Sequence, residues 1–224
     1  MKSLLPRVDD VLRRRRWAAD NHSPTRTILT LTGLLVFCGA LYGAALGTFG
    51  GITPDRFEQI LYSAIKIPLL LLATFAISLP SFYVLNMLFG VGDDFRSAVR
   101  ALVATQAGIA IVLASLAPYT LLWYLSTSAY NGGILFNAFL FTIATSTGQW
   151  MLRQDYRELI RRNPVHRRLM IGWVVIYATV GIQMGWTLRP FFGSPETETE
   201  FLRSGEWTNA FVVIGRIIWN VLAN

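Results

Sequence analysis

Residues 67–92 read IPLLLLATFAISLPSFYVLNMLFGVG, a run without a charged side chain between Lys66 and Asp93. As an α-helix rising about 1.5 Å per residue, this run is roughly 39 Å long and exceeds the ~30 Å of bilayer hydrocarbon. Soluble helices are rarely apolar on every face over such a length. The run also contains Pro68 and Pro80, which membrane helices tolerate where neighbouring helices cover the broken backbone bond. The stretch therefore predicts a membrane-spanning helix.

The composition of the whole chain agrees with a membrane protein. Of its 224 residues, 53% are apolar and 15% are charged, which leaves no room for a sizeable soluble domain. The formal net charge is +7, and every basic residue except Lys2 and Lys66 is an arginine. These residues lie beside apolar runs, where they orient the chain and contact anionic lipid headgroups rather than nucleic acid. Because Cys38 is the single cysteine, an intrachain disulfide is excluded.

Further apolar runs predict the remaining spans. They cover 28–50, 101–124, 133–152 and 169–188, so that five transmembrane helices are expected in total. A last apolar segment, 208–222, is short and contains Arg216, and it is either a sixth span or an interfacial helix. We therefore predict an all-α membrane protein, a bundle of five transmembrane helices plus this terminal element. Residues 1–27 form a basic N-terminal segment, and residues 28–224 form a single transmembrane helical domain.

The distribution of basic residues predicts the orientation of the chain. The segments 1–27, 90–100 and 152–168 contain 15 of the 20 basic residues. An excess of arginine and lysine marks the cytoplasmic loops of membrane proteins. We therefore expect an integral membrane protein with a cytoplasmic N-terminus. The remaining basic residues are Arg56, Lys66, Arg189 and Arg203 on the outer side and Arg216 in the last segment, and Lys66 is expected to reach the lipid headgroups.

Two arginine groups are candidates for contact with anionic lipid or an acidic partner. The first lies in residues 1–20, where apolar residues at helical spacing predict either a helix on the membrane surface or a solvated basic tail. The second follows the fourth predicted span. The alternative role for both groups is to set the orientation alone. The candidate residues are Arg13, Arg14, Arg15, Arg16, Arg153, Arg157, Arg161, Arg162, Arg167 and Arg168.

Glycines four residues apart predict close helix packing. Gly39, Gly43 and Gly47 form a G-x-x-x-G-x-x-x-G pattern in the first span, and Gly181 and Gly185 form a shorter one in the fifth. Small residues at this spacing create a flat face on which another membrane helix can approach closely. The partner helix lies in this chain or in another. Polytopic bundles use such faces at their own interfaces, which favours a partner within the chain.

The sequence has few of the residues and motifs that an enzyme or a proton pump needs. The predicted spans contain no aspartate or glutamate, which argues against proton-coupled transport. His22 and His166 have no second ligand at a suitable spacing, so neither a metal nor a cofactor is predicted, and both side chains are expected to face solvent or headgroups. The sequence lacks the G-x-S-x-G, P-loop and H-E-x-x-H motifs, and we predict no catalytic residue.

Neutral polar residues inside the predicted spans have two interpretations. In the first, they line a path for a solute, next to a helix kink at Pro80. In the second, which is favoured, they form hydrogen bonds between helices. Thr74 and Ser78 are expected to bond to the backbone that Pro80 frees. The candidate kink or path residues are Pro80, Gln106, Asn137, Gln149 and Gln183.

Four stretches carry a resemblance to other proteins: ALYGAALGTFGG, KIPLLLLATFAISLPSFYVLN, LASLAPYTLLWY and GIQMGWTLRPFFGSP. Over most of residues 39–219 the chain resembles an uncharacterised group of bacterial polytopic inner-membrane proteins, and more distantly it is similar to the Yip1-like membrane family. The second similarity is carried by the basic cytoplasmic N-terminus and the following bundle of about five spans, and the first resemblance implies a location in the bacterial inner membrane. Eukaryotic members act in membrane trafficking. Their aspartate-leucine-tyrosine-glycine-proline motif is absent, with only Leu41-Tyr42-Gly43 similar to it, so no functional residue is carried over.

Packing chemistry without a recognisable reactive site predicts a non-enzymatic integral membrane protein. We expect a scaffold or a subunit of a membrane assembly, with anionic lipids and other membrane proteins as partners and no nucleic acid. A small-solute transporter or channel is the alternative, and a polar cavity at mid-membrane would favour it. A lipid-modifying enzyme with an interfacial site near Arg189 or His166 is the third candidate.

Overall fold

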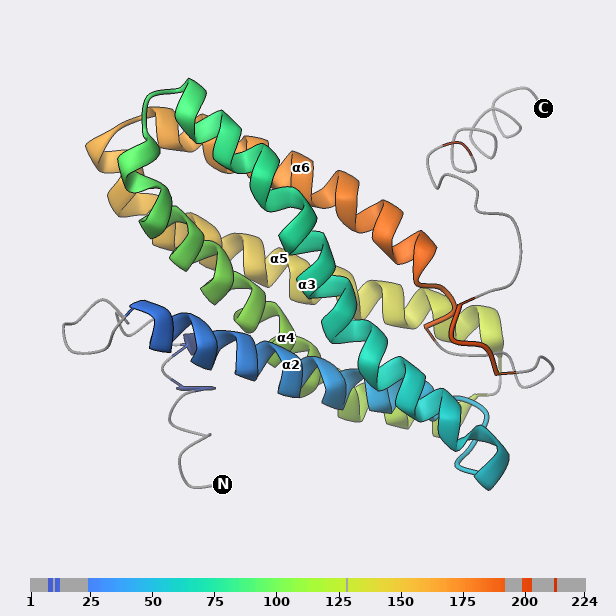
Figure 1. Cartoon of the computed structure of the whole chain (residues 1–224). Helices are drawn as coiled ribbons and strands as arrows, with labels where there is room; N and C mark the ends of the chain where they lie inside the picture. Colours follow the sequence, from blue (N-terminus) through green and yellow to red (C-terminus); the bar gives the residue numbers. More distant parts are fainter. Residues whose placement is uncertain are drawn as a thin grey trace, which may run out of the picture.

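A computed structural model describes residues 8–9, 11–12, 24–127, 129–191, 199–202 and 212 (Figure 1). This part of the chain is helical and contains no β-strand, which confirms the prediction of an all-α protein. The elements are α2 (Pro24–Gly47), η1 (Pro54–Arg56), α3 (Phe57–Leu88), η2 (Gly92–Asp94), α4 (Phe95–Ser126), α5 (Tyr130–Arg162) and α6 (Val165–Thr187). Here η denotes a short 3₁₀-helix.

Four of these helices are long and apolar enough to cross a membrane, in agreement with an integral membrane protein. They cover Thr25–Gly47, Phe57–Leu88, Gly92–Ser126 and Val165–Thr187. Helix α5 has 33 residues, but its C-terminal part is rich in charged side chains, and it is not among these four. Its role as a fifth span therefore stays a prediction. Residues 208–222 lie outside the described part of the chain apart from residue 212.

Helix α3 is longer than the uncharged run that predicted it. It begins at Phe57, ten residues before that run. Its first turns carry polar side chains, so they do not belong to the uncharged apolar run. Gln59, Ser63 and Lys66 in these turns are nevertheless buried. The helix ends before Gly90, whose positive φ of 69° allows the tight turn into η2 and α4.

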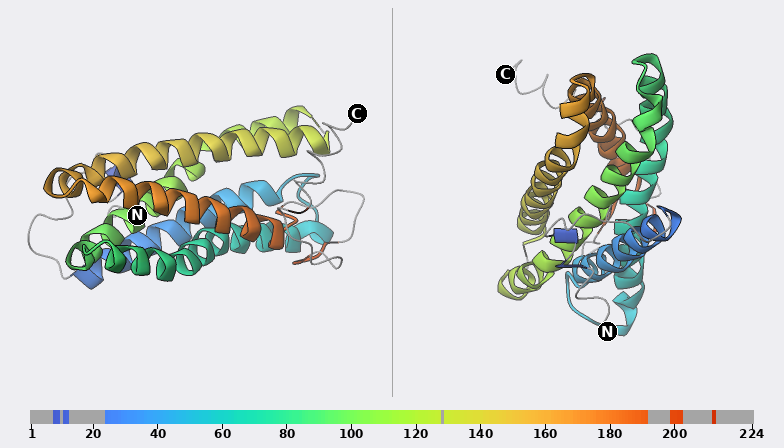
Figure 2. Two further views of the ribbon diagram at one scale, coloured as in Figure 1. Left: turned by 90° about the horizontal axis from the view of Figure 1, so that it is seen from above. Right: turned by 90° about the vertical axis from the view of Figure 1, so that its left-hand side faces the viewer.

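The five long helices run alternately in opposite directions through one elongated bundle (Figures 1 and 2). The turn between α3 and α4 lies beside the turn between α5 and α6, and α2 begins at the same end (Figure 1). Helix α2 packs against both α3 and α4, α5 packs mainly against α4, and α6 packs mainly against α3. The bundle thus has one end formed by the α3–α4 turn and the arginine-rich α5–α6 turn, and an opposite end that contains Lys66.

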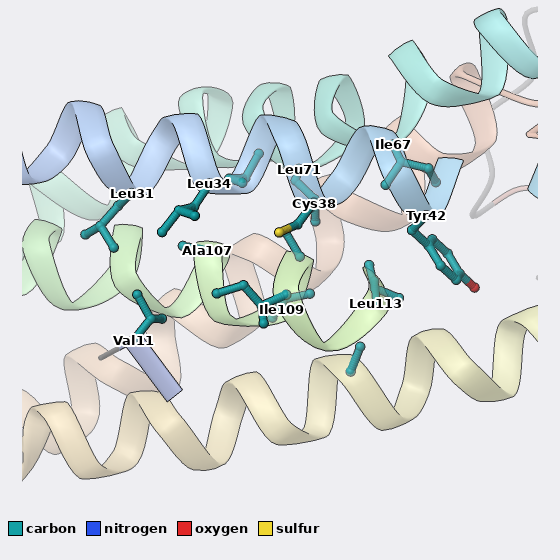
Figure 3. Packing of buried hydrophobic residues seen from close by; sticks show 14 of the residues in the cluster. Val11, Leu31, Leu34, Cys38, Tyr42, Ile67, Leu71, Ala107, Ile109 and Leu113 are labelled. Carbon is teal, nitrogen blue, oxygen red and sulfur yellow. The ribbon is translucent and has the colours of Figure 1, made fainter. Parts of the chain in front are cut away.

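Two apolar clusters fill the bundle. The first joins α2 to α3, α4 and α5 through residues such as Leu34, Cys38 and Leu113 (Figure 3). Val11 belongs to it and is 3% exposed, so the described part of the N-terminal segment packs against the bundle. The second cluster, which includes Trp173, joins α3, α4, α5 and α6 near the arginine-rich end. The two clusters together keep all five helices in contact.

Candidate functional site

The glycine pattern of α2 lies against α3. A Cβ atom at Gly43 would come within 2.8 Å of the Cα atom of Ala64, and one at Gly47 within 2.5 Å of the Cα atom of Ile60. One at Gly39 would lie 3.4 Å from the backbone nitrogen of Pro68. Backbone thus meets backbone along this interface, which requires glycine on α2. The helix that this face contacts belongs to the same chain.

The second glycine pair, on α6, is packed much less closely. A Cβ atom at Gly181 would lie 3.5 Å from the Cγ2 atom of Thr74 in α3, an ordinary van der Waals distance. At Gly185 it would meet no described atom within 4 Å. The close packing expected at both glycines is therefore absent at Gly185 within the described part of the bundle.

Asn137 is the centre of a buried hydrogen-bond network between three helices. Its Oδ1 atom accepts hydrogen bonds from Tyr42 Oη on α2 and Thr120 Oγ1 on α4, both at 3.2 Å. Its Nδ2 atom donates to Tyr124 Oη at 2.7 Å and to the carbonyl of Gly133 at 2.8 Å. Every polar atom of the Asn137 side chain thus takes part in helix packing. The sequence did not predict Tyr42 and Tyr124 as partners of Asn137. A tyrosine inside an apolar run nevertheless indicates a buried polar contact, because its hydroxyl needs a hydrogen-bond partner.

Gln106 makes a separate link between helices. Its Oε1 atom accepts a 2.8 Å hydrogen bond from Tyr177 Oη on α6. The other candidate path residues are placed differently, since Gln149 and Gln183 are half-buried and Pro80 is exposed. Gln106 and Asn137 belong to different networks, so these contacts do not join the two residues into one path.

The two hydroxyls near Pro80 do not behave as expected. Thr74 and Ser78 are 1% and 0% exposed, and neither Oγ atom has a hydrogen-bond partner among the described residues. The prediction that they bond to backbone freed by Pro80 is therefore wrong. Both side chains lie on the packed face of α3, where the Cγ2 atom of Thr74 faces Gly181 of α6.

Lys66 does not extend to the lipid headgroups as predicted. It is 0% exposed, and its Nζ atom donates a hydrogen bond to the carbonyl of Pro190, in the segment that follows α6. The same Nζ atom lies 5.1 Å from the centre of the Phe201 ring. One turn earlier, Ser63 donates to the carbonyl of Phe191. A buried ammonium needs such partners, and together they attach this segment to α3.

His166 is also placed differently from its prediction. It is 0% exposed instead of facing solvent or headgroups, and its Nε2 atom lies 3.1 Å from Oδ2 of Asp94. The contact joins the α3–α4 turn to the start of α6. Arg189, the other residue of the lipid-modifying alternative, lies with its guanidinium carbon 3.5 Å from the centre of the Trp186 ring. Neither arrangement resembles an accessible reactive group.

The second arginine group is exposed at one end of the bundle. All six of its members, Arg153, Arg157, Arg161, Arg162, Arg167 and Arg168, are exposed. Glu158 forms ion pairs with Arg161 at 3.3 Å and with Arg162 at 3.7 Å. Such solvent-exposed pairs bind weakly and leave the positive charge available to anionic groups. Arg13, Arg14, Arg15 and Arg16 lie outside the described residues.

The described residues contain no group of three or more histidine, cysteine or acidic side chains suited to a metal ion. No protein-family model, curated protein or solved structure matches the chain.

Proposed function

We propose that this chain is a non-enzymatic inner-membrane protein with five transmembrane helices and a cytoplasmic N-terminus, and that it serves as a scaffold or subunit of a membrane assembly. The similarity to the Yip1-like family stays a prediction alongside this proposal. The geometry supports the proposal in three ways, which concern α5, the outer face of α6 and the arginine-rich end.

The position of α5 supports five spans. It runs antiparallel to α4 and packs along it (Figures 1 and 2). Because α4 is long and apolar enough to cross the bilayer, a helix packed along it crosses as well. The lower apolarity of α5 comes largely from the charged residues at its C-terminal end, and the polar side chain of Asn137 is satisfied inside the bundle. Orientation follows from the arginine-rich α5–α6 turn, which belongs on the cytoplasmic side.

The outer face of α6 is the surface that supports a role as a subunit, because it can contact another membrane protein. Helix α6 is the least covered of the four candidate spans. Ile171, Val175 and Ile182 are 55%, 59% and 46% exposed, and their spacing places them on one face. Gly185 shares this face, and a Cβ atom there would meet no atom of the described residues within 4 Å. A helix of another membrane protein can approach closely at a glycine, whereas lipid alone gains nothing from one.

The arginine-rich end gives this subunit a second contact surface. Six exposed arginines lie in the α5–α6 region, and Arg96 is exposed at the neighbouring turn. Arginine side chains beside a membrane attract anionic headgroups by about 1 kcal/mol each. We therefore expect anionic lipid at this end while the outer face of α6 contacts the protein partner.

Native mass spectrometry of protein purified in mild detergent tests the proposal. The wild-type chain is expected to carry a stoichiometric membrane-protein partner. Gly185→Ile should fold, since the position is open, but should lose that partner because the added side chain fills the approach. Gly33→Ile is the matched control, because Gly33 on α2 also has open space around it. A wild-type protomer or homo-oligomer that carries lipid alone would contradict the proposal.

A transporter or channel for small solutes is the second candidate function. The satisfied side chains of Gln106 and Asn137 disfavour it, but Thr74 and Ser78 favour it, because buried hydroxyls without partners are unexpected in a dry interior. Uptake of small solutes into liposomes distinguishes this candidate from the scaffold.

A further inference from the structure

Two hydroxyls of α3, those of Thr74 and Ser78, are buried without the local hydrogen bond that many helical hydroxyls of the bundle make. Seven threonine and serine side chains donate to the carbonyl four residues earlier: Thr30, Thr105, Ser115, Ser126, Thr142, Thr147 and Thr187. This local bond is the usual way to satisfy a hydroxyl inside a membrane helix. Thr74 and Ser78 do not make it and have no other partner among the described residues. Both are almost fully buried, so bilayer lipid does not reach them.

The way in which α3 and α6 pair places a third polar residue, Tyr177, at the level of Thr74 and Ser78. A Cβ atom at Gly181 would lie 3.5 Å from the Cγ2 atom of Thr74, and the ring centres of Phe82 and Trp173 are 5.1 Å apart. Because the two helices are antiparallel, Ser78 lies opposite Tyr177, midway between these two contacts. Thr74 and Ser78 are four residues apart, as are Tyr177 and Gly181, so each pair lies on one face of its helix.

Tyr177 extends the polar region to α4. Its hydroxyl donates to Oε1 of Gln106, which is 3% exposed, and therefore it keeps a lone pair that can accept one further hydrogen bond. Thr74 and Ser78 can each donate one. The region thus offers donors and acceptors from three helices, near the middle of α3 and α6.

The region has no charged side chain at its level. Residues 67–88 of α3, 101–126 of α4 and 169–187 of α6 are uncharged. An ion would lose its hydration there without a counter-charge, whereas a small neutral molecule would gain hydrogen bonds. The buried hydroxyls would otherwise remain unsatisfied at a cost in free energy.

We propose that α3, α4 and α6 enclose a binding site at the middle of the membrane, where Thr74, Ser78 and Tyr177 hold a small uncharged hydrogen-bonding molecule. The chemistry fits water and neutral solutes such as urea or glycerol. Gln106 positions Tyr177 for this contact. The site is independent of the scaffold role, because it lies inside the bundle and not on the outer face of α6.

The direction in which the Tm changes when both hydroxyls are removed tests the proposed site. Thr74→Val combined with Ser78→Ala removes both hydroxyls with little change in shape, and thermal unfolding is measured in lipid nanodiscs. If the hydroxyls bind a molecule, the double variant should unfold about 4–8 °C below the wild type. If the site is empty, replacing unsatisfied hydroxyls with apolar groups is neutral or stabilising. An unchanged or raised Tm would therefore overturn the proposal.

Matched controls and single variants keep this test decisive. Thr142→Val and Thr147→Val remove exposed hydroxyls that bond to their own helix, and each should shift the Tm by less than about 2 °C. If the double variant does not fold, the Tm values of Thr74→Val and Ser78→Ala measured singly decide by the same sign.

Liposome swelling then distinguishes the occupants. Urea and glycerol are added outside proteoliposomes that contain the wild type or the double variant. Faster uptake through the wild type assigns a small solute to the site, and equal uptake together with the lowered Tm assigns bound water.

Discussion

Gly43→Ala is expected to separate α2 from α3 and to destabilise the bundle at or beyond the upper end of the usual 1–3 kcal/mol for overpacking. The added Cβ atom would collide with the backbone of Ser63 and lie 2.8 Å from the Cα atom of Ala64. Backbone on a packed helix cannot move aside as a flexible side chain can. The yield of monodisperse protein in gel filtration and its Tm measure the effect.

Gly33→Ala is the control for this prediction, because it lies on the same helix and a Cβ atom there meets no described atom within 4 Å. Alanine favours a helix over glycine by up to about 1 kcal/mol, so this variant should be as stable as the wild type or slightly more stable. A Gly43→Ala protein with the wild-type Tm would show that the two backbones are not in contact.

Trp173→Ala is expected to cost about 3 kcal/mol of unfolding free energy through the cavity that it leaves. The Trp173 side chain is 1% exposed and its ring lies 5.1 Å from that of Phe82, 5.6 Å from that of Phe75 and 5.5 Å from that of Tyr177. Lipid is as apolar as a protein core, so burial itself contributes little, but the lost ring contacts remain. Thermal or denaturant unfolding in detergent measures the loss.

Trp150→Ala is the matched control, since this tryptophan of α5 is 59% exposed. Its removal leaves no internal cavity and should change the unfolding free energy by less than about 1 kcal/mol. Equal losses in the two variants would contradict the placement of Trp173 at the centre of the second cluster.

The helical architecture could be predicted from the sequence because apolar runs of membrane length are rare outside membranes. The start of α3 could not, since Gln59, Ser63 and Lys66 resemble a polar loop in a hydropathy pattern. They are buried because the segment after α6 returns to α3 and supplies carbonyl oxygens for Lys66 and Ser63. That segment is separated from Lys66 by 124 residues, a contact that local sequence does not encode.

For the candidate sites too, the sequence predicted local features but not the contacts between distant residues. The spacing of Gly39, Gly43 and Gly47 identified a close-packing face, but its partner α3 emerged from the structure. Asn137 was a candidate from its polarity alone, whereas its partner Tyr42 lies 95 residues away. His166 appeared exposed because it lies among arginines, although packing buries it beside Asp94. Periodicity predicts which residues share a face, and tertiary packing decides what that face meets.

Whether α5 crosses the membrane is tested most directly by the accessibility of single cysteines at its two ends. Asn131→Cys and Arg161→Cys are made in a Cys38→Ala background, and right-side-out vesicles are treated with a membrane-impermeant thiol reagent. Both positions are exposed. Five spans and a cytoplasmic N-terminus predict that residue 131 is labelled at once and residue 161 only after the vesicles are permeabilised. Labelling of both positions from one side would contradict the five-span bundle.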